Sequence, residues 1–318
     1  MRMLLVLLLL TPTVAAAQSG YPNRPIRMIV PLAAASSVDN AARIVTQKMS
    51  ESLGQPIAII NQPGASGVIG ADQVARALAD GYTLGGFNDS ILTMVPVTMP
   101  KVPWDPMKDF AFISLVGTIE FGLVAHNDVP FGDVAGLIAA AKMAPDTITY
   151  GSGGIGSPQH IAMVMFAEAA GIKLRHIPYR GATQAATDIA GGQVDIGFQG
   201  LPAVAGLVRG GQMKLLGVGS DTPLAQFPAA PTIAATQPGF HFSTWFGMVA
   251  PPKTPQAILD RLQAEVVKAV ADPDVQQKLQ AQGFVVKATS AETLRAATER
   301  QLVTYRKVVQ DTGIAPAK

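Results

Sequence analysis

Short apolar runs alternate along the chain with longer segments whose apolar residues recur every three or four positions. IRMIV at residues 26–30 predicts a buried strand, and residues 40–53 predict a helix that ends at Gly54. IAII at 57–60 and YTLGGF at 82–87 predict two more strands. Strand, loop, helix and strand in this order predict right-handed βαβ units, an α/β fold and a mostly parallel sheet.

A second series of the same kind begins near FGLVAH, residues 121–126. It continues with a helix at 134–144, a strand at 147–151, a helix at 157–171, a strand at 174–179, a helix at 183–192 and a strand at 194–200. WFGMVAP at 245–251 then predicts a strand that returns to the first series, followed by a helix at 254–270 and, after Pro273, another helical pattern.

The length of 318 residues favours two domains, because a single hydrophobic core rarely grows so large. Since no long linker is evident, the chain is expected to cross between domains near residues 122 and 244. The first domain then comprises residues 18–122 and 245–318, and the second comprises residues 123–244. Ahead of the last helix, Thr289 and Glu292 have the spacing of a capping box.

The first 17 residues have the layout of a secretory signal peptide. Arg2 precedes an unbroken apolar run from Leu4 to Leu10, and small residues at 15–17 provide a cleavage site near Ala17. This apolar run is shorter than the roughly 20 residues that span a bilayer. We therefore expect an exported protein located in the periplasm, without membrane insertion of the mature chain.

The composition excludes further classes of function. The chain has no cysteine, which excludes disulfides and thiolate chemistry, and its formal net charge is only +2. A chain this close to neutral, without a basic run, gives no reason to expect nucleic acid as a partner.

GSGGIG at residues 151–156 matches the G-x-G-x-x-G pattern of dinucleotide-binding turns. Such a turn requires an acidic residue at the end of the next strand, to bind the ribose. That predicted strand, LRHIPY, contains no carboxylate, although Arg175 or Arg180 could suit a phosphate-bearing variant. We expect no cofactor, and interpret the glycines as a loop whose backbone amides, together with the following helix, bind an anion.

Three more loops of small residues, PLAAASS, PGASGVIG and PYRGAT, also follow predicted strands and precede helices. Ligands of open α/β sheets bind at such positions. Together with the GSGGIG loop, these loops supply backbone amides and the hydroxyl groups of Ser36, Ser37, Ser66, Ser152, Ser157 and Thr183.

Signatures of enzymes and metal sites are absent from the sequence. There is no G-x-S-x-G, H-E-x-x-H, EF-hand or P-loop motif. His126, His160, His176 and His241 are scattered, although His160 merits attention because it follows the glycine loop. Structural roles are expected for Asp80, Asp105, Asp109, Asp195, Trp104 and Trp245.

Several segments together resemble one family, from about Tyr21 to Gly313. They include YPNRPIRMIVP, GQPIAIINQPGASGVIGADQVARALADGYTL, KVPWDPMKDFAFIS, YGSGGIGSPQHIA, HIPYRGATQAATDIAGGQVDIGF, PAAPTIAATQPGF and TWFGMVAPPKTP. The chain is similar to Bug or TctC-like substrate-binding proteins of the tripartite tricarboxylate transporters. The resemblance implies a two-lobed periplasmic binding protein of the Venus flytrap type that closes on a small organic carboxylate and delivers it to membrane transporter subunits.

The resemblance also implies a ligand site built from amides and small hydroxyl groups. By position, its residues would be Ala34, Ala35, Ser36, Ser37, Ser66, Asn88, Ser152, Gly153, Ser157, His160, Gly181, Ala182, Thr183 and Gln199. The chain departs from the family pattern at Leu32, at Ala35-Ser36 and at Gln199-Gly200. The family usually has an aromatic residue after the proline of the first loop, a glycine pair in that loop, and an Asp-Asn type pair after the later strand. Because these changes fall at positions of the ligand site, the resemblance does not identify the ligand. A sensor-accessory protein and an exported enzyme remain the alternative functions.

Overall fold

The computed structural model describes residues 20–99, 101–287 and 289–312. The predicted signal peptide and its cleavage site lie outside the described residues. The strands are β1 (Ile26–Val30), β2 (Ile57–Asn61), β3 (Thr83–Asn88), β4 (Ala111–Ala125), β5 (Thr149–Ser152), β6 (Arg175–Pro178), β7 (Ile196–Gly200), β8 (Lys214–Val218), β9 (Ser243–Ala250) and β10 (Phe284–Val286).

The α-helices are α1 (Ser37–Leu53), α2 (Val68–Ala75), α3 (Asp89–Thr93), α4 (Val95–Thr98), α5 (Val134–Met143), α6 (Pro158–Ala170), α7 (Ala182–Ala190), α8 (Leu201–Arg209), α9 (Gln256–Ala271), α10 (Pro273–Ala281) and α11 (Ala291–Thr312). Two 3₁₀ turns, η1 (Ala65–Gly67) and η2 (Ile233–Ala235), lie between them. The predicted alternation of strands and helices is therefore present in both series.

The strands form one ten-stranded sheet in the order β2-β1-β3-β9-β4-β7-β5-β6, with β10 and β8 also paired to β4. The end strands pair in parallel, β1 with β2 and β3, and β5 with β6 and β7. The central strands β4 and β9 pair antiparallel with their neighbours. The predicted α/β class is confirmed, with the parallel βαβ units at the two ends of a mixed sheet.

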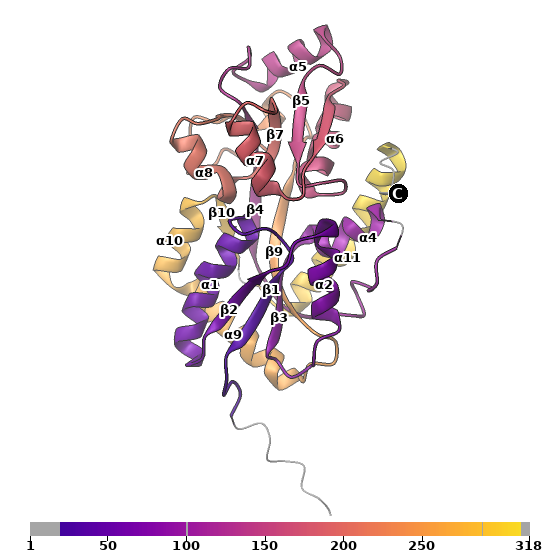
Figure 1. Ribbon diagram of the computed structural model, residues 1–318. Helices are drawn as coiled ribbons and strands as arrows, with labels where there is room; N and C mark the ends of the chain where they lie inside the picture. The colour runs from indigo at the N-terminus through magenta and orange to yellow at the C-terminus, as the bar shows by residue number, and fades with distance from the viewer. Residues whose placement is uncertain (1–19, 100, 288, 313–318) are drawn as a thin grey trace, which may run out of the picture.

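Figure 1 shows these two ends as two lobes, with β1–β3, α1, α2, α9 and α11 in one and β5–β7 and α5–α8 in the other. Strand β4 belongs to both. Its first part pairs with β9 and β10, and its last part, from Phe121 to Ala125, pairs with β7 and β8. The positions expected for the domain crossings, residues 122 and 244, lie within β4 and β9.

Burial explains why these segments form their elements. All six residues of β3 are buried, and β1 exposes only Arg27, so both strands lie between layers of helices. Helix α1 buries Val38, Ala42, Val45 and Met49 against the sheet, at the spacing of one helical face.

Two sequence expectations are corrected. The strand expected to begin near residue 121 begins at Ala111, because its first part, as far as Glu120, pairs with β9, far along the chain. The capping box at Thr289 is wrong. The Thr289 backbone N–H donates to Leu115 O, which keeps this residue extended beside β4, and Ser290 Oγ accepts from the Thr293 N–H instead.

Candidate functional site

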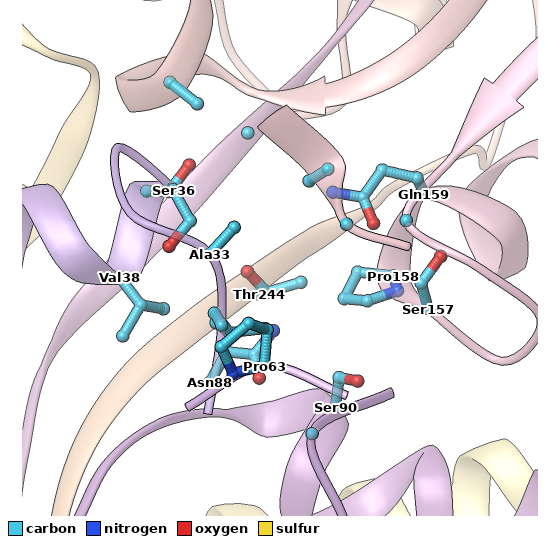
Figure 2. Close-up of a pocket in the computed structure, with 18 of the residues that line it drawn as sticks. Ala33, Ser36, Val38, Pro63, Asn88, Ser90, Ser157, Pro158, Gln159 and Thr244 are labelled. Carbon is cyan, nitrogen blue, oxygen red and sulfur yellow. The ribbon is translucent and has the colours of Figure 1, made fainter. Parts of the chain in front are cut away.

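A cavity that is partly open to solvent lies between the two lobes, and its empty space, counted together with the adjoining open solvent, is about 740 Å³. Figure 2 shows Ala33 and Ser36 on one side, Ser157, Pro158 and Gln159 on the opposite side, and Thr244 between them. The walls are the loops after β1, β2, β3, β5, β6 and β7, at the carboxyl ends of the parallel strands where α/β sheets bind ligands.

Nine of the fourteen residues expected at the site line this cavity: Ser36, Ser37, Ser66, Asn88, Gly153, Ser157, Gly181, Ala182 and Gln199. The other five, Ala34, Ala35, Ser152, His160 and Thr183, are not among the lining residues. Each of these five nevertheless makes contacts that shape or close the loops around the cavity.

The loop after β1 is held by one buried carboxylate, that of Asp39. Asp39 Oδ2 accepts from the Ala35 N–H at 2.9 Å and from Arg43 Nε at 3.0 Å, and Oδ1 accepts from Asn61 Nδ2 at 2.9 Å. Ala35 has a left-handed backbone, with φ of 60°. Burial opposes ionisation of Asp39, but the hydrogen bonds from Arg43, Asn61 and Ala35 outweigh it and lower the pKa of the carboxyl group. Asp39 therefore fixes an unusual turn at the cavity wall.

The GSGGIG loop is held by two side chains that are not among the residues lining the cavity. The Gly156 N–H donates to His160 Nδ1 at 3.1 Å, and the Gly154 N–H donates to Ser152 Oγ at 3.1 Å. Gly154 and Gly156 have φ of 115° and 76°, which only glycine adopts readily. Ser152 and His160 thus support the loop rather than the cavity surface.

Three rings stack under this loop. His160 and His176 lie nearly parallel with centroids 4.3 Å apart, and Tyr150 stacks on His176 at 4.7 Å. Burial lowers the pKa of His160 to about 4, and burial together with His160 lowers the pKa of His176 to about 4. Both rings are therefore neutral at neutral pH, which lets His160 Nδ1 accept from Gly156.

The lowered pKa of His160 predicts a dependence of stability on pH. Between about pH 4 and 6.5 the unfolded chain binds the proton that folded His160 excludes, so stability falls as the pH falls. From pH 6.5 to 5, His160 alone should account for a loss of roughly 2 kcal/mol in the free energy of unfolding. Urea unfolding at both pH values should show a loss smaller by about that amount in His160→Phe; equal losses in both proteins would contradict the assignment.

Several helices begin at the cavity wall, and the longer ones among them include α1, α6, α7 and α8. Their N-termini contribute partial positive charge and free backbone amides. Helices α7 and α8 follow Gly181 and Gly200 and have no side-chain cap, which leaves their first amides available to a ligand. Among the described residues that line the cavity, the one charged side chain is that of Arg180, and none is acidic. The site is therefore suited to an anion.

Direct hydrogen bonds join the two lobes around the cavity. Thr183 Oγ1 donates to Ala34 O at 3.1 Å, Ser66 Oγ donates to Ile155 O at 3.2 Å, and Asn40 Nδ2 donates to Pro202 O at 3.2 Å. These bonds connect residues that lie 89 to 162 positions apart in the chain. The described structure therefore has the two lobes in contact around the site.

Several lining residues were not predicted from the sequence. Three of them lie within two positions of expected residues: Ser90, Gln159 and Arg180. The loop pattern therefore indicated these segments, but not which side chains in them line the cavity. Phe121 and Thr244 had no such signal, because they belong to β4 and β9 and reach the cavity only through long-range strand pairing.

The remaining chemical candidates lie outside the cavity. Asp80, Asp105, Asp109 and Asp195 hydrogen-bond backbone N–H groups nearby in the structure, and Trp245 Nε1 donates to Gln301 Oε1. Trp104 is buried in the core. Within residues 20–99, 101–287 and 289–312, no three His, Cys, Asp or Glu side chains gather as metal ligands, and no helix is long and apolar enough to span a membrane.

The fold and the cavity define a class, that of two-lobed periplasmic solute-binding proteins. Residues 41–314 match the family model described as the tripartite tricarboxylate transporter family receptor, TctC. The BugT protein of Bordetella pertussis strain Tohama I is 33% identical over 95% of this chain and 94% of its own length.

Solved structures give the same result. The periplasmic binding protein BugD is similar with a TM-score of 0.89 and 31% identity over 93% of this chain and 99% of its own. A protein of R. palustris with bound adipate has a TM-score of 0.91 and 29% identity over 93% of this chain and 100% of its own. The chain belongs to the TctC family of tripartite tricarboxylate transporter receptors. The Bug/TctC-like resemblance inferred from the sequence is confirmed.

Proposed function

We propose that this receptor binds a small organic carboxylate in the cavity between its lobes and delivers it to the membrane subunits of a tripartite transporter. The observation that carries the proposal is the convergence of four helix N-termini on a cavity whose described lining contains no acidic side chain. The adipate in the R. palustris structure is a carboxylate of this kind.

The proposed ligand residues are the nine expected residues that line the cavity, together with Gln159 and Thr244. Two or three charge-assisted hydrogen bonds to a carboxylate, at roughly 1.5–3 kcal/mol each, supply much of the ~8 kcal/mol of a micromolar affinity. The apolar wall, which includes Ile119 and Phe121, and the exclusion of water on closure supply the rest.

The lobes in this proposal comprise residues 18–122 with 245–318, and residues 123–244. The signal peptide of residues 1–17 directs the chain to the periplasm, where cleavage near Ala17 releases it. We further propose that the receptor is not an enzyme. Ser152 Oγ lies 2.6 Å from His176 Nε2, as in a nucleophile–base pair, but Ser152 is buried and is not among the residues that line the cavity, so a molecule bound there does not contact it.

A thermal-shift screen of residues 18–318 tests the function. The panel contains mono-, di- and tricarboxylates, aromatic acids and amino acids, with nicotinamide cofactors as the control. Ligand bound to the native state raises the melting temperature by mass action. A rise with a subset of the acids supports the receptor function. A rise with the cofactors alone would overturn it and restore the dinucleotide interpretation of GSGGIG.

A further inference from the structure

Gln199, the fourth residue of β7, carries a polar group that the protein does not satisfy. Its side chain is fully buried and lines the cavity, yet neither Oε1 nor Nε2 has a hydrogen-bond partner among the described residues. Its neighbour Gly200 precedes α8, so the amide lies where a helix N-terminus meets the cavity. Buried side-chain amides in folded proteins nearly always have hydrogen-bond partners. The partners of the Gln199 amide therefore come from the molecule that the cavity binds.

A second unsatisfied atom lies on the opposite lobe. Asn88 ends β3 and is 6% exposed, and its Oδ1 has no partner in the described part of the chain. Asn88 lines the cavity together with Pro63 and Ser90, which are labelled in Figure 2. Gln199 and Asn88 thus line one cavity, one from each lobe, and each has a buried side-chain oxygen without a partner among the described residues.

These acceptors distinguish between ligands. An ionised carboxylate is only an acceptor, so it can pair with Gln199 Nε2 but not with Oε1 of Gln199 or Oδ1 of Asn88. The two oxygens require an O–H or N–H group of the bound molecule. A carboxylate without such a group leaves a buried carbonyl oxygen unpaired or dependent on a bridging water.

The charge of the cavity wall determines which kind of hydrogen-bond donor a ligand can place there. An ammonium group is costly to bury unless an acidic side chain accompanies it, and none lines the cavity within the described residues. Arg180, at the wall, would repel it. A hydroxyl group carries no charge and both donates and accepts, so it can pair with either end of the Gln199 amide.

We infer that Gln199, with Asn88, selects a hydroxycarboxylate over both the unsubstituted acid and the amino acid of the same skeleton. The inference rests on the proposed function, since it specifies the ligand of the same cavity. Gln199 is then a specificity-determining residue that contacts the hydroxyl group, while the amides at the helix N-termini bind the carboxylate.

The test uses matched triplets of probes, measured by isothermal titration calorimetry on residues 18–318. The triplets are propionate, lactate and alanine; succinate, malate and aspartate; and glutarate, 2-hydroxyglutarate and glutamate, with both enantiomers of each substituted acid. In the triplet that binds, we expect one hydroxy acid to bind at least tenfold more tightly than the other two members.

Variants at position 199 separate the amide from the rest of the site. Gln199→Met keeps the length of the side chain and should reduce the preference for the hydroxy acid to less than threefold, with little change for the unsubstituted acid. Gln199→Glu introduces an acceptor for ammonium and should shift the preference toward the amino acid. The control is Gln193→Met, because Gln193 is exposed and outside the cavity, and it should retain the wild-type preference.

The melting temperature of the ligand-free protein tests the inference independently of how tightly the acids bind. Gln199→Met removes two buried polar atoms that lack partners, so its melting temperature should equal or exceed that of the wild type. A lower melting temperature would mean that the amide is already satisfied within the protein, and would overturn the inference.

Each binding result has one meaning. Equal affinity across a triplet, tighter binding of the amino acid, or an unchanged preference in Gln199→Met overturns the role of Gln199 but leaves the receptor function intact. If no acid of these triplets or of the wider screen binds, the proposed function itself is wrong, and this inference falls with it.

Discussion

Asp39→Ala is expected to lower the free energy of unfolding by about 3 kcal/mol, and to weaken ligand binding at least tenfold. The substitution leaves the Ala35 N–H without its acceptor, removes one of the two acceptors of Asn61 Nδ2, and removes the carboxylate that pairs with Arg43. Removing one member of a buried, hydrogen-bonded ion pair commonly costs ~3–5 kcal/mol; the lower value applies because half of the Arg43 side chain is exposed.

The binding defect should follow from the same contacts. Ala35 has a left-handed backbone that the Asp39 carboxylate stabilises, and Ser36 and Ser37 follow it at the cavity wall. Without Asp39 this turn relaxes, and the two hydroxyl groups no longer have fixed positions. Urea unfolding and calorimetric titration with the best acid of the screen measure the two effects.

Asp133→Ala is the matched control, because Asp133 also accepts from a backbone N–H, that of Gly136 at 2.7 Å, but far from the cavity. It should cost about 1 kcal/mol, as other helix N-caps do, and leave binding unchanged. The stability difference between wild type and Asp39→Ala should shrink as the pH falls below the ordinary aspartate pKa, since the lowered pKa of Asp39 stabilises the fold only while the carboxyl is ionised. Equal losses in the two variants at neutral pH would contradict this role for Asp39.

Gly200→Val is expected to reduce ligand affinity at least tenfold, about 1.4 kcal/mol, while the protein still folds. Gly200 has an ordinary backbone, with φ of −61°, so a side chain causes no local strain. A Cβ atom there would overlap Ser37 Oγ of the opposite lobe and lie 3.3 Å from Ile119 Cγ2. The lobes could not approach as closely, and the cavity would stay open.

Calorimetry and small-angle X-ray scattering with ligand measure this effect together. The variant should keep the larger radius of gyration of an open form when the acid is added. Gly206→Val, in the neighbouring helix α8, is the control because a Cβ atom there meets nothing within 4 Å. Wild-type affinity in Gly200→Val would show that the approach of Gly200 to Ser37 is not needed for binding.

The sequence predicted the loops of the site because their signals are local. Small residues between an apolar strand and a helix, as in GSGGIG and PLAAASS, indicate a turn at the carboxyl end of a strand wherever the strand lies. Nine expected residues line the cavity for this reason. Ser152 and His160 have the same local signal, but which side of a loop a side chain faces depends on the packing beneath it, here the stack with His176.

Features that depend on distant strands could not be predicted in this way. Strand β4 begins at Ala111 because β9, more than a hundred residues later, pairs with it, and Thr244 reaches the cavity from that strand. The antiparallel position of β9 between β3 and β4 has no local signature. Nor could the sequence show that Gln199 lacks a partner, because that requires knowledge of every neighbouring atom.

The two lobes share a strand, and this gives the molecule a mechanical property. Because β4 carries backbone hydrogen bonds in both halves of the sheet, any rotation of one half against the other must be absorbed as twist of a paired strand. Such a connection resists rotation elastically and does not act as a free hinge. It limits the angular range of the lobes and provides a restoring force, so the ligand's contacts across the cavity work against a stiffness set by the sheet itself.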